Sequence, residues 1–206
     1  KGLNPNTAVS WNAPYVGPIM LNDAMFHGIW PASIYPHNDN LCAECASPPV
    51  LTEDGVLETR IPYFKIGRAF HQGVIMHYLK PRPLNPLGLA ESMAYGQHPF
   101  DLVGTPLIEK LDPSITRYMQ FYRKHKEYFK GAETFPEVGV WNSYSALAYA
   151  TFGPLLSLML FQQTLVQAKV PFDFVFDEEL HDIAKYPTFA LPNVVAISDE
   201  QVKRLE

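Results

Sequence analysis

Apolar positions in the carboxyl-terminal third of the chain switch repeatedly between a strand pattern and a helix pattern. Residues 137–141 form a short apolar run that predicts a strand. Residues 154–169 follow a Gly-Pro pair and carry apolar side chains at spacings of three and four, which predicts a helix. Residues 170–176 and 189–197 are rich in β-branched, aromatic or other apolar side chains and predict two further strands.

Turns and helix caps made of polar residues separate these strands and helices. An acidic turn or short helix begins at residues 177–179, and Ser198, three residues before Gln201, forms the capping box of a last helix. Strands that alternate with helices predict a doubly wound, parallel α/β sheet with right-handed crossovers. Because the chain stops at Glu206, where the third crossover helix begins, we expect a piece of a longer polypeptide or one chain of a nicked one.

The first part of the chain has fewer periodic runs. Most of the 19 prolines lie before Pro113, which indicates long ordered loops of the kind found on the face of an enzyme barrel. Residues 1–18 and 27–50 are interpreted as loops and residues 52–55 as a turn. Helices are predicted at residues 60–79, 87–95 and 113–129.

Two histidines fall on the first of these predicted helices. His71 and His77 are six residues apart, so they do not share a helix face in the way that an i, i+4 pair does. This spacing favours structural roles for both residues over a role as ligands.

Composition and charge exclude some classes of protein. A formal net charge of −5 over 206 residues gives no basic footprint for a nucleic acid. No run of eighteen apolar residues occurs, so no membrane span is expected. Cys42 and Cys45 form a single CxxC pair without the second pair or the spaced histidines of a zinc site, so ordinary thiols or a local structural role are favoured and no metal is expected.

The carboxyl-terminal segment resembles a known family. It is similar to the middle, flavodoxin-like domain of family-42 β-galactosidases and their relatives, which is called the β-galactosidase trimerisation domain and is itself similar to class I glutamine amidotransferases. The resemblance is carried by Phe-Asp at 172–173, Asp-Glu-Glu-Leu at 177–180, Lys-Tyr at 185–186, Leu-Pro-Asn at 191–193 and Ser-Asp-Glu-Gln-Val at 198–202.

This resemblance implies a domain organisation. Residues 1–130 would be the carboxyl-terminal part of a (β/α)8 barrel of the glycoside hydrolase type, and residues 131–206 the first half of a flavodoxin-like sheet. The rest of the same polypeptide, or another chain, would complete both domains. The resemblance also implies a carbohydrate as ligand, with a β-galactoside as one candidate, a homo-oligomeric state, and no cofactor.

Glycoside hydrolysis usually needs two carboxylic acids across the scissile bond, placed in a barrel at the carboxyl ends of strands. Glu44, flanked by small residues in Cys-Ala-Glu-Cys-Ala-Ser, is the candidate catalytic residue. Aromatic and polar residues around it fit sugar stacking and hydroxyl recognition. The candidate substrate-binding residues are Asp23, Trp30, His37, Asp39 and, near the mouth of the expected barrel, His98. A rigid surface loop with Asx turns and solvated carboxylates is the alternative interpretation.

Two functions therefore stay open from the sequence. The first is a glycoside hydrolase, and the second is a structural or carbohydrate-binding component that keeps the hydrolase fold without the pair of carboxylates. Glutaminase chemistry is excluded for the last segment because no cysteine follows Cys45. Residues 142–145 lack the glycines of a phosphate-binding loop, which disfavours a phosphate-binding module.

Overall fold

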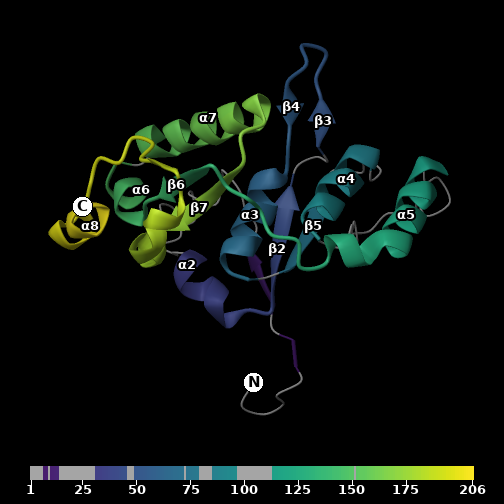
Figure 1. Cartoon of the computed structure of the whole chain (residues 1–206), viewed down its shortest axis with the longest axis horizontal. Coiled ribbons are helices and arrows are strands. Elements are labelled where there is room, and N and C mark those ends of the chain that lie inside the picture. The colour runs from purple at the N-terminus through teal and green to yellow at the C-terminus, as the bar shows by residue number, and fades with distance from the viewer. Residues whose placement is uncertain are drawn as a thin grey trace. The chain divides into compact units, whose positions relative to one another are not determined.

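The computed structural model describes most of the chain (Figure 1). The described residues are 7–8, 10–13, 31–45, 49–71, 73–78, 85–96, 113–150 and 152–206. They belong to two compact units, which are described separately below: unit 1 comprises Lys1–Gly17 and Tyr35–Glu133, and unit 2 comprises Pro18–Ile34 and Thr134–Glu206. The predicted mixed α/β class is confirmed, with small parallel sheets; the described residues form no closed barrel.

A three-stranded parallel sheet forms the centre of unit 1. Its strands are β1 (Ser10–Ala13), β2 (Asn40–Cys45) and β5 (Gly73–Tyr78), and they lie side by side in the order of the chain. The prediction of continuous loops at residues 1–18 and 27–50 is therefore wrong where β1 and β2 lie. Both strands contain asparagine, which is depleted in strands, so their pattern does not stand out from the surrounding turn residues.

The predicted helix at residues 60–79 is two elements. Helix α3 (Ile61–Ala69) ends early, and residues 73–78 form β5. The break comes at His71, whose φ of 56° is left-handed and cannot continue a helix. Gly73 and the β-branched Val74 and Ile75 then favour an extended chain.

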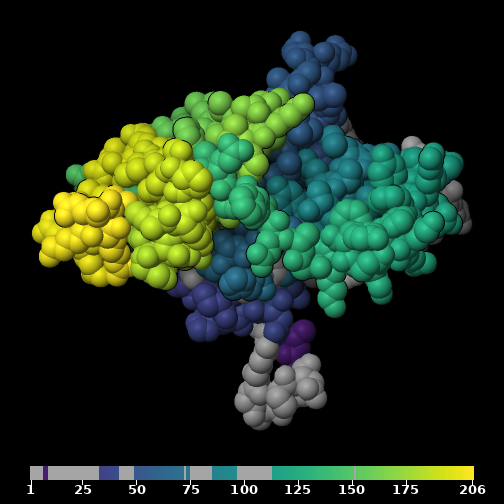
Figure 2. Space-filling view, in the orientation of Figure 1, coloured from purple at the N-terminus to yellow at the C-terminus, as the bar shows by residue number. Residues whose placement is uncertain are grey.

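A β-hairpin of unit 1 confirms the predicted turn at residues 52–55. Strands β3 (Val50–Leu51) and β4 (Leu57–Glu58) are antiparallel, and the Thr52 hydroxyl accepts a hydrogen bond from the Val56 amide. Gly55 takes a φ of 77°, which glycine adopts without steric cost. The hairpin projects from the rest of unit 1 in both views (Figures 1 and 2).

Two helices confirm the predictions at residues 87–95 and 113–129. Helix α4 (Pro86–Ala94) begins at Asn85, whose side-chain oxygen accepts a hydrogen bond from the Gly88 amide. Helix α5 (Pro113–Phe129) packs against α4. The shared core consists of Leu89, Met93, Ile115 and Tyr122.

Glu91 of α4 is buried and anchors the start of α3. Its carboxylate accepts hydrogen bonds from the Thr59 hydroxyl at 2.5 Å and from the Arg60 amide at 2.9 Å. Burial raises the pKa of the Glu91 carboxyl, and the two hydrogen bonds and the Arg60 charge oppose that rise. Because a buried carboxyl needs such partners, we assign Glu91 a structural role.

Unit 2 contains a second three-stranded parallel sheet with a different strand order. Its strands are β6 (Val138–Asn142), β7 (Phe172–Phe176) and β8 (Thr188–Ala190), with β6 in the middle. The crossover from β6 to β7 runs through α6 (Tyr144–Ala150) and α7 (Phe152–Ala168). These elements confirm the strand–helix–strand prediction. The four-residue α2 (Pro31–Ile34) also belongs to this unit, and the 3-10 turn η2 (Tyr35–His37) follows it in unit 1.

The last strand of unit 2 is shorter than predicted. The sequence pattern predicts a strand at residues 189–197, but β8 ends at Ala190. Pro192 lacks an amide hydrogen and Asn193 adopts a φ of 51°, so the chain turns there instead of extending the ladder.

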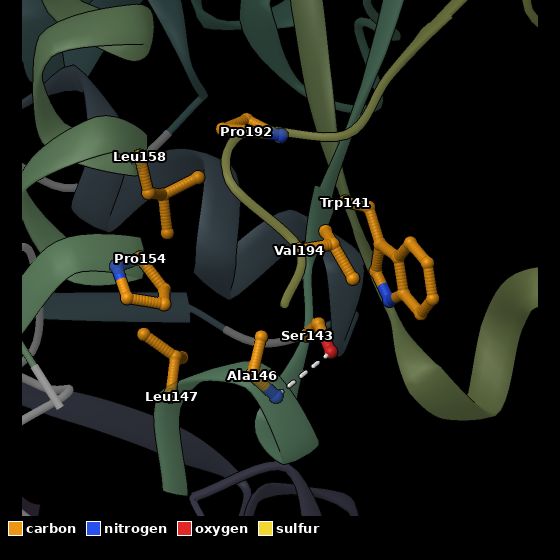
Figure 3. A pocket seen from close by; sticks show the side chains of 8 residues that line it. All are labelled: Trp141, Ser143, Ala146, Leu147, Pro154, Leu158, Pro192 and Val194. Carbon is orange, nitrogen blue, oxygen red and sulfur yellow. Dashed lines mark hydrogen bonds between the residues drawn. The ribbon is translucent and has the colours of Figure 1, made fainter. Parts of the chain in front are cut away.

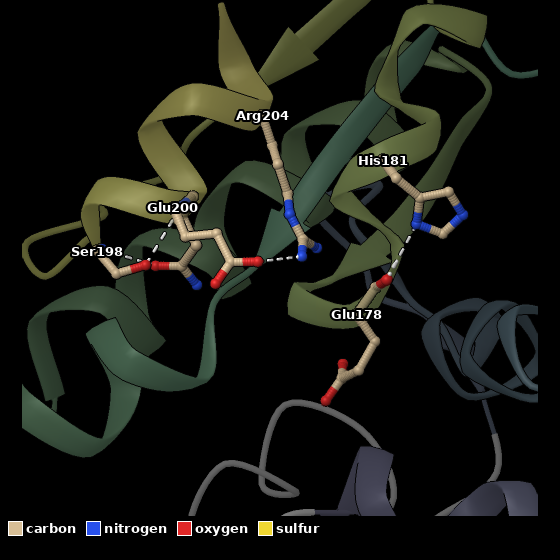
Figure 4. Close-up of polar contacts among 6 residues, drawn as sticks. Glu178, His181, Ser198, Glu200 and Arg204 are labelled. Carbon is tan, nitrogen blue, oxygen red and sulfur yellow. Dashed lines mark hydrogen bonds and ion pairs between the residues drawn. The ribbon is translucent and has the colours of Figure 1, made fainter.

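Two short helical elements cover one face of this sheet. The 3-10 helix η4 (Asp177–Lys185) and helix α8 (Asp199–Leu205) pack with Trp141 and Val175, burying Leu180. The predicted capping box of α8 is present: Ser198 and Gln201 exchange hydrogen bonds between side chain and backbone amide. Figure 4 shows the other local contacts, a Glu200–Arg204 ion pair at 2.5 Å on α8 and His181 beside the Glu178 carbonyl on η4.

Within the described ranges, no helix is both long enough and apolar enough to cross a lipid bilayer.

Candidate functional site

Glu44 lies near the carboxyl end of β2, the middle strand of the unit 1 sheet. The register pairs Glu44 with His77 of β5, and both are the fifth residue of a six-residue strand. The backbone therefore brings a carboxylic acid and an imidazole residue to neighbouring positions at one edge of a parallel sheet. Active sites of parallel α/β folds lie at this edge.

The two faces of the sheet differ in their residues. One face carries the polar positions Ser10, Asn12, Asn40, Glu44 and His77, together with Cys42, Gly73 and Ile75, as the register and the strand period of two require. On the other face Leu41 and Val74 are register partners, and both are buried. Since apolar burial explains one face, the polar face is the better candidate for chemistry.

The structure places His37 and Asp39 at the other end of β2. His37 ends η2, and Asp39 directly precedes the first residue of the strand. A strand rises about 3.3 Å per residue, so Asp39 is separated from Glu44 by roughly 16 Å along the chain. His37 and Asp39 are both exposed. The strand therefore does not bring His37 and Asp39 together with Glu44.

The other candidates divide into two groups. Asp23, Trp30 and His98, and the expected substrate-facing strand at residues 99–103, lie outside the described residues. Cys42 and Cys45 both lie in β2, three positions apart, and so occupy opposite faces of the strand. No group of three or more histidine, cysteine, aspartate or glutamate residues in the described part of the chain could hold a metal ion.

A hydrogen-bonded network lies at the carboxyl edge of the unit 2 sheet. The Asp177 carboxylate accepts hydrogen bonds from the Trp141 indole Nε1–H at 2.7 Å and from the Tyr144 amide at 3.2 Å. It thereby joins the ends of β6 and β7 to the start of α6. Burial raises the pKa of the Asp177 carboxyl and the neighbouring Glu178 charge adds to the rise, while the hydrogen bond from Trp141 opposes it.

Asn142 and Ser143 follow Trp141 at this edge. The Ser143 hydroxyl accepts a hydrogen bond from the Ala146 amide and so caps α6. The Asn142 side chain is 3% exposed, and its Oδ1 has no hydrogen-bond partner among the described residues. An unsatisfied buried acceptor of this kind indicates an ordered water or a strained position.

The neighbouring cavity is small (Figure 3). It has a volume of about 10 Å³, and Leu158 of α7 and Pro192 and Val194 of the loop after β8 close it on one side. A cavity of that size holds one water molecule at most. In a doubly wound fold the crevice at the carboxyl ends of diverging strands is the usual ligand site. Here apolar side chains line it, so this cavity has no room for a nucleotide or a sugar.

A much larger hollow lies between α4 and α5 of unit 1. Its volume is about 570 Å³, within the range of small-molecule sites. It is lined by Ala90, Met93, Ala94, Ser114, Arg117, Tyr118, Phe121 and Phe129. Small residues of α4 thus face aromatic rings and one guanidinium of α5, an arrangement that suits an amphipathic ligand.

Three features of the structure are absent from the sequence-based predictions: the position of His77 in a strand, the unsatisfied Asn142 side chain and the α4–α5 hollow. His77 falls within the helix predicted at residues 60–79, although Gly73 and the β-branched pair after it favour a strand. Nothing in the sequence marks the unsatisfied Asn142, because its burial depends on the register of β6 with β7. The α4–α5 hollow depends on how two separate helices pack, which no local pattern encodes.

No protein-family model, curated protein or solved structure matches this chain.

Proposed function

We propose that this chain is part of a glycoside-hydrolase-like protein that acts on a carbohydrate through Glu44, with a β-galactoside as the candidate substrate. The observation that carries the proposal is the position of Glu44 at the carboxyl end of β2, beside His77 of β5, in a parallel sheet. The resemblance of the carboxyl-terminal segment to the middle domain of family-42 β-galactosidases supplies the substrate class.

Strand order supports a barrel origin for unit 1. Its parallel strands are neighbours in chain order, β1-β2-β5, and α3 lies in the crossover between β2 and β5. Successive strand–helix units of a (β/α)8 barrel are arranged in this way. We propose that residues 1–130 are the last part of such a barrel.

Strand order supports a different origin for unit 2. The order β7-β6-β8 places the first strand between the second and the third, which is how the flavodoxin-like doubly wound fold begins. We propose that residues 131–206 are the first half of that fold. Because its crevice is filled, its proposed role is packing and subunit contact rather than catalysis.

Glu44 would act as nucleophile or general base. In retaining enzymes a carboxylate attacks the anomeric carbon, and a second carboxylic acid protonates the leaving oxygen. The partner acid would come from elsewhere in the protein, and Asp23 is a candidate from this chain. A second carboxylate about 5–5.5 Å from Glu44 would give retention, and one about 6.5–9.5 Å away would give inversion.

The test is hydrolysis of a panel of 4-nitrophenyl glycosides by the full chain. Glu44→Gln removes the ionisable group at almost constant volume and should lower kcat by about 10²–10⁴-fold. Glu58→Gln, at an exposed position of β4, is the matched control and should leave kcat unchanged. Equal loss in both variants, or no hydrolysis by the wild-type chain with any substrate, would remove the support for catalysis.

A second candidate function is carbohydrate binding without hydrolysis, and the α4–α5 hollow favours it. Exposed Phe121 could stack on a pyranose ring, and Arg117 could bind its hydroxyls. Calorimetric titration with galactose and galactobiose distinguishes the two functions. Binding that Phe121→Ala abolishes and Glu44→Gln preserves would favour this second function.

Association with further copies of the chain is also proposed. Helix α7 is apolar on its exposed side, where Phe152, Leu156 and Leu160 are spaced four residues apart. A helix that is apolar on all sides is normally covered by a partner. Sedimentation velocity of the wild type and of Leu160→Lys tests this proposal, since the charged variant should shift toward the monomer.

A further inference from the structure

Helices α4 and α5 hold the hollow between them in place (Figure 1). Their shared core includes Met93, which also lines the hollow. Gly96, which follows α4, lies against the backbone at the end of α5, because a Cβ atom there would come within 2.6 Å of the Phe129 carbonyl oxygen. Packing of the two helices at these points forms the hollow without a ligand, as in most small-molecule sites.

Three polar side chains interrupt an otherwise apolar lining. They are Ser114, Arg117 and Tyr118 of α5. Arg117 carries the charge, since no described residue of the lining is aspartate, glutamate or lysine. The acidic residue of α4, Glu91, accepts hydrogen bonds from Thr59 and Arg60 instead. The described lining is therefore apolar with one positive charge that no lining carboxylate balances.

The Arg117 guanidinium is available to a ligand. The residue is exposed, and within the described ranges its side chain makes no hydrogen bond or ion pair. Helix α5 carries three further lysine or arginine residues against one glutamate, whereas the chain as a whole has a formal net charge of −5. The hollow therefore lies beside a locally positive helix of an acidic protein, which attracts an anion.

An aromatic surface lies next to Arg117. Phe121 comes four residues later on the same side of α5, and it is 50% exposed. The centroid of the Phe121 ring is 4.7 Å from that of His125 and 6.3 Å from that of Phe129. A half-exposed cluster of rings beside a cation suits a ligand that has an apolar body and an anionic group.

We propose that the hollow binds a small organic carboxylate, whose apolar body packs against Met93 and Phe121 and whose carboxylate pairs with Arg117. A guanidinium binds a carboxylate through two parallel hydrogen bonds, and the pair is stronger where apolar side chains exclude water. A sugar needs hydrogen-bond partners on several sides, whereas this lining is mainly apolar. The ligand class therefore differs from the carbohydrate of the proposed functions, and the inference does not rest on hydrolysis at Glu44.

Fluorine NMR of 4-(4-fluorophenyl)butyrate, titrated with the full chain at pH 7, tests the proposal. The neutral analogue 4-(4-fluorophenyl)butanamide has the same ring and chain without the charge. We expect the carboxylate to bind at least about tenfold more tightly than the amide, because it gains a charge-assisted pair with Arg117. Arg117→Gln should remove this difference by weakening binding of the carboxylate alone. Equal affinities of the two compounds for the wild type, or no binding of the carboxylate, would overturn the proposal.

Arg123→Gln is the matched control for charge. It removes the same charge from α5 at an exposed position that does not line the hollow. Arg123 follows Arg117 by six residues and so lies on a different side of the helix. The Arg123→Gln variant should keep the preference for the carboxylate. The same loss in both arginine variants would indicate a general effect of the charge of α5 and would overturn the role of Arg117.

A further variant tests the place of binding without a change of charge. Ala94 is exposed and lines the hollow, so the indole of Ala94→Trp should fill it and weaken binding of both compounds by about tenfold or more. Ala184→Trp, at an exposed position of η4, is the matched control and should leave both affinities unchanged. Wild-type affinities in Ala94→Trp would place the ligand elsewhere and overturn the proposal.

Competition with galactose separates this inference from carbohydrate binding in the same hollow. We expect equimolar galactose to leave the fluorinated carboxylate bound. Its displacement by galactose would make the hollow a sugar site and overturn the assignment of an organic carboxylate. Near-ultraviolet circular dichroism of each variant shows whether the fold is kept; if Ala94→Trp does not fold, the comparison of Arg117→Gln with Arg123→Gln still decides the proposal.

Discussion

Gly139 occupies a position of β6 where any side chain would collide with its neighbours. A Cβ atom there would lie 2.7 Å from Cδ2 of Tyr186 and 2.9 Å from Cδ2 of Phe189. Gly139→Ala should therefore destabilise the protein by about 1–3 kcal/mol, because the ring of Tyr186 must move out of a packed face. Urea unfolding followed by tryptophan fluorescence measures this change.

Gly153→Ala is the matched control for that substitution. A Cβ atom at Gly153 would approach the side-chain amide of Asn193 at 3.2 Å, and that flexible group can move. The residue lies in the first turn of α7, where alanine favours the helix. The unfolding free energy of the Gly153→Ala variant should stay within about 1 kcal/mol of the wild-type value. A Gly139→Ala variant as stable as Gly153→Ala would show that Tyr186 does not restrict β6.

Asp177 makes stability depend on pH with a definite sign. Its raised pKa means that the folded chain keeps the proton to higher pH than the unfolded chain does. The stabilisation linked to that proton is complete below the ordinary aspartate pKa and is lost as pH rises through the raised value. Asp177→Asn removes this term. The difference in unfolding free energy, Asp177→Asn minus wild type, should therefore increase between pH 4 and pH 7. Urea unfolding of both proteins at each pH measures this difference. A difference that does not change with pH would contradict the assignment.

Helix α4 shows how one side chain can serve two elements. The oxygen of Asn85 caps α4 through the Gly88 amide, and its Nδ2 donates a hydrogen bond to the Pro49 carbonyl at 2.7 Å beside the β3–β4 hairpin. Asn85→Ala loses both contacts and should cost about 1–2 kcal/mol of unfolding free energy. Asn85→Asp keeps the cap and loses the contact with Pro49, so it should cost less. Equal losses in the two variants would show that the cap contributes little.

At the scale of elements, the sequence is more informative for unit 2 than for unit 1. Long periodic runs predicted α5 and α7, and Ser198 with Gln201 predicted the start of α8. The short strands β1 and β2 were missed because their residues also suit turns, and a strand forms there only through pairing across the sheet. The left-handed turn at His71 separates α3 from β5, and no residue-type preference requires it.

The candidate site was predicted in part. Glu44 was identified from its small neighbours and the carboxylate requirement of the chemistry. Its neighbour His77 could not be identified, because their proximity is a property of the ladder between β2 and β5. The separation of Asp39 from Glu44 likewise follows from the strand that lies between them, where the sequence had indicated one continuous loop.

At the scale of the molecule, the irregular residues 132–136, where the chain passes from unit 1 into the long segment of unit 2, should be open to a protease. They have no regular structure, and Glu133 among them is exposed. Limited digestion with endoproteinase Glu-C should therefore cut after Glu133 before it cuts at Glu127, which is exposed but lies in helix α5. Mass spectrometry should find fragments 1–133 and 134–206. Glu133→Gln should delay the cut, and an unchanged cleavage pattern in that variant would contradict the assignment.

The helical crossover of unit 2 has a thermodynamic consequence. Residues 138–168 contain no lysine, arginine, aspartate or glutamate, and Leu160 on α7 is 69% exposed. Self-association through this face would release ordered water without releasing counterions. Its strength should therefore change little between 0.05 and 1 M sodium chloride, increase in ammonium sulfate, and decrease when the solution is cooled toward 0 °C.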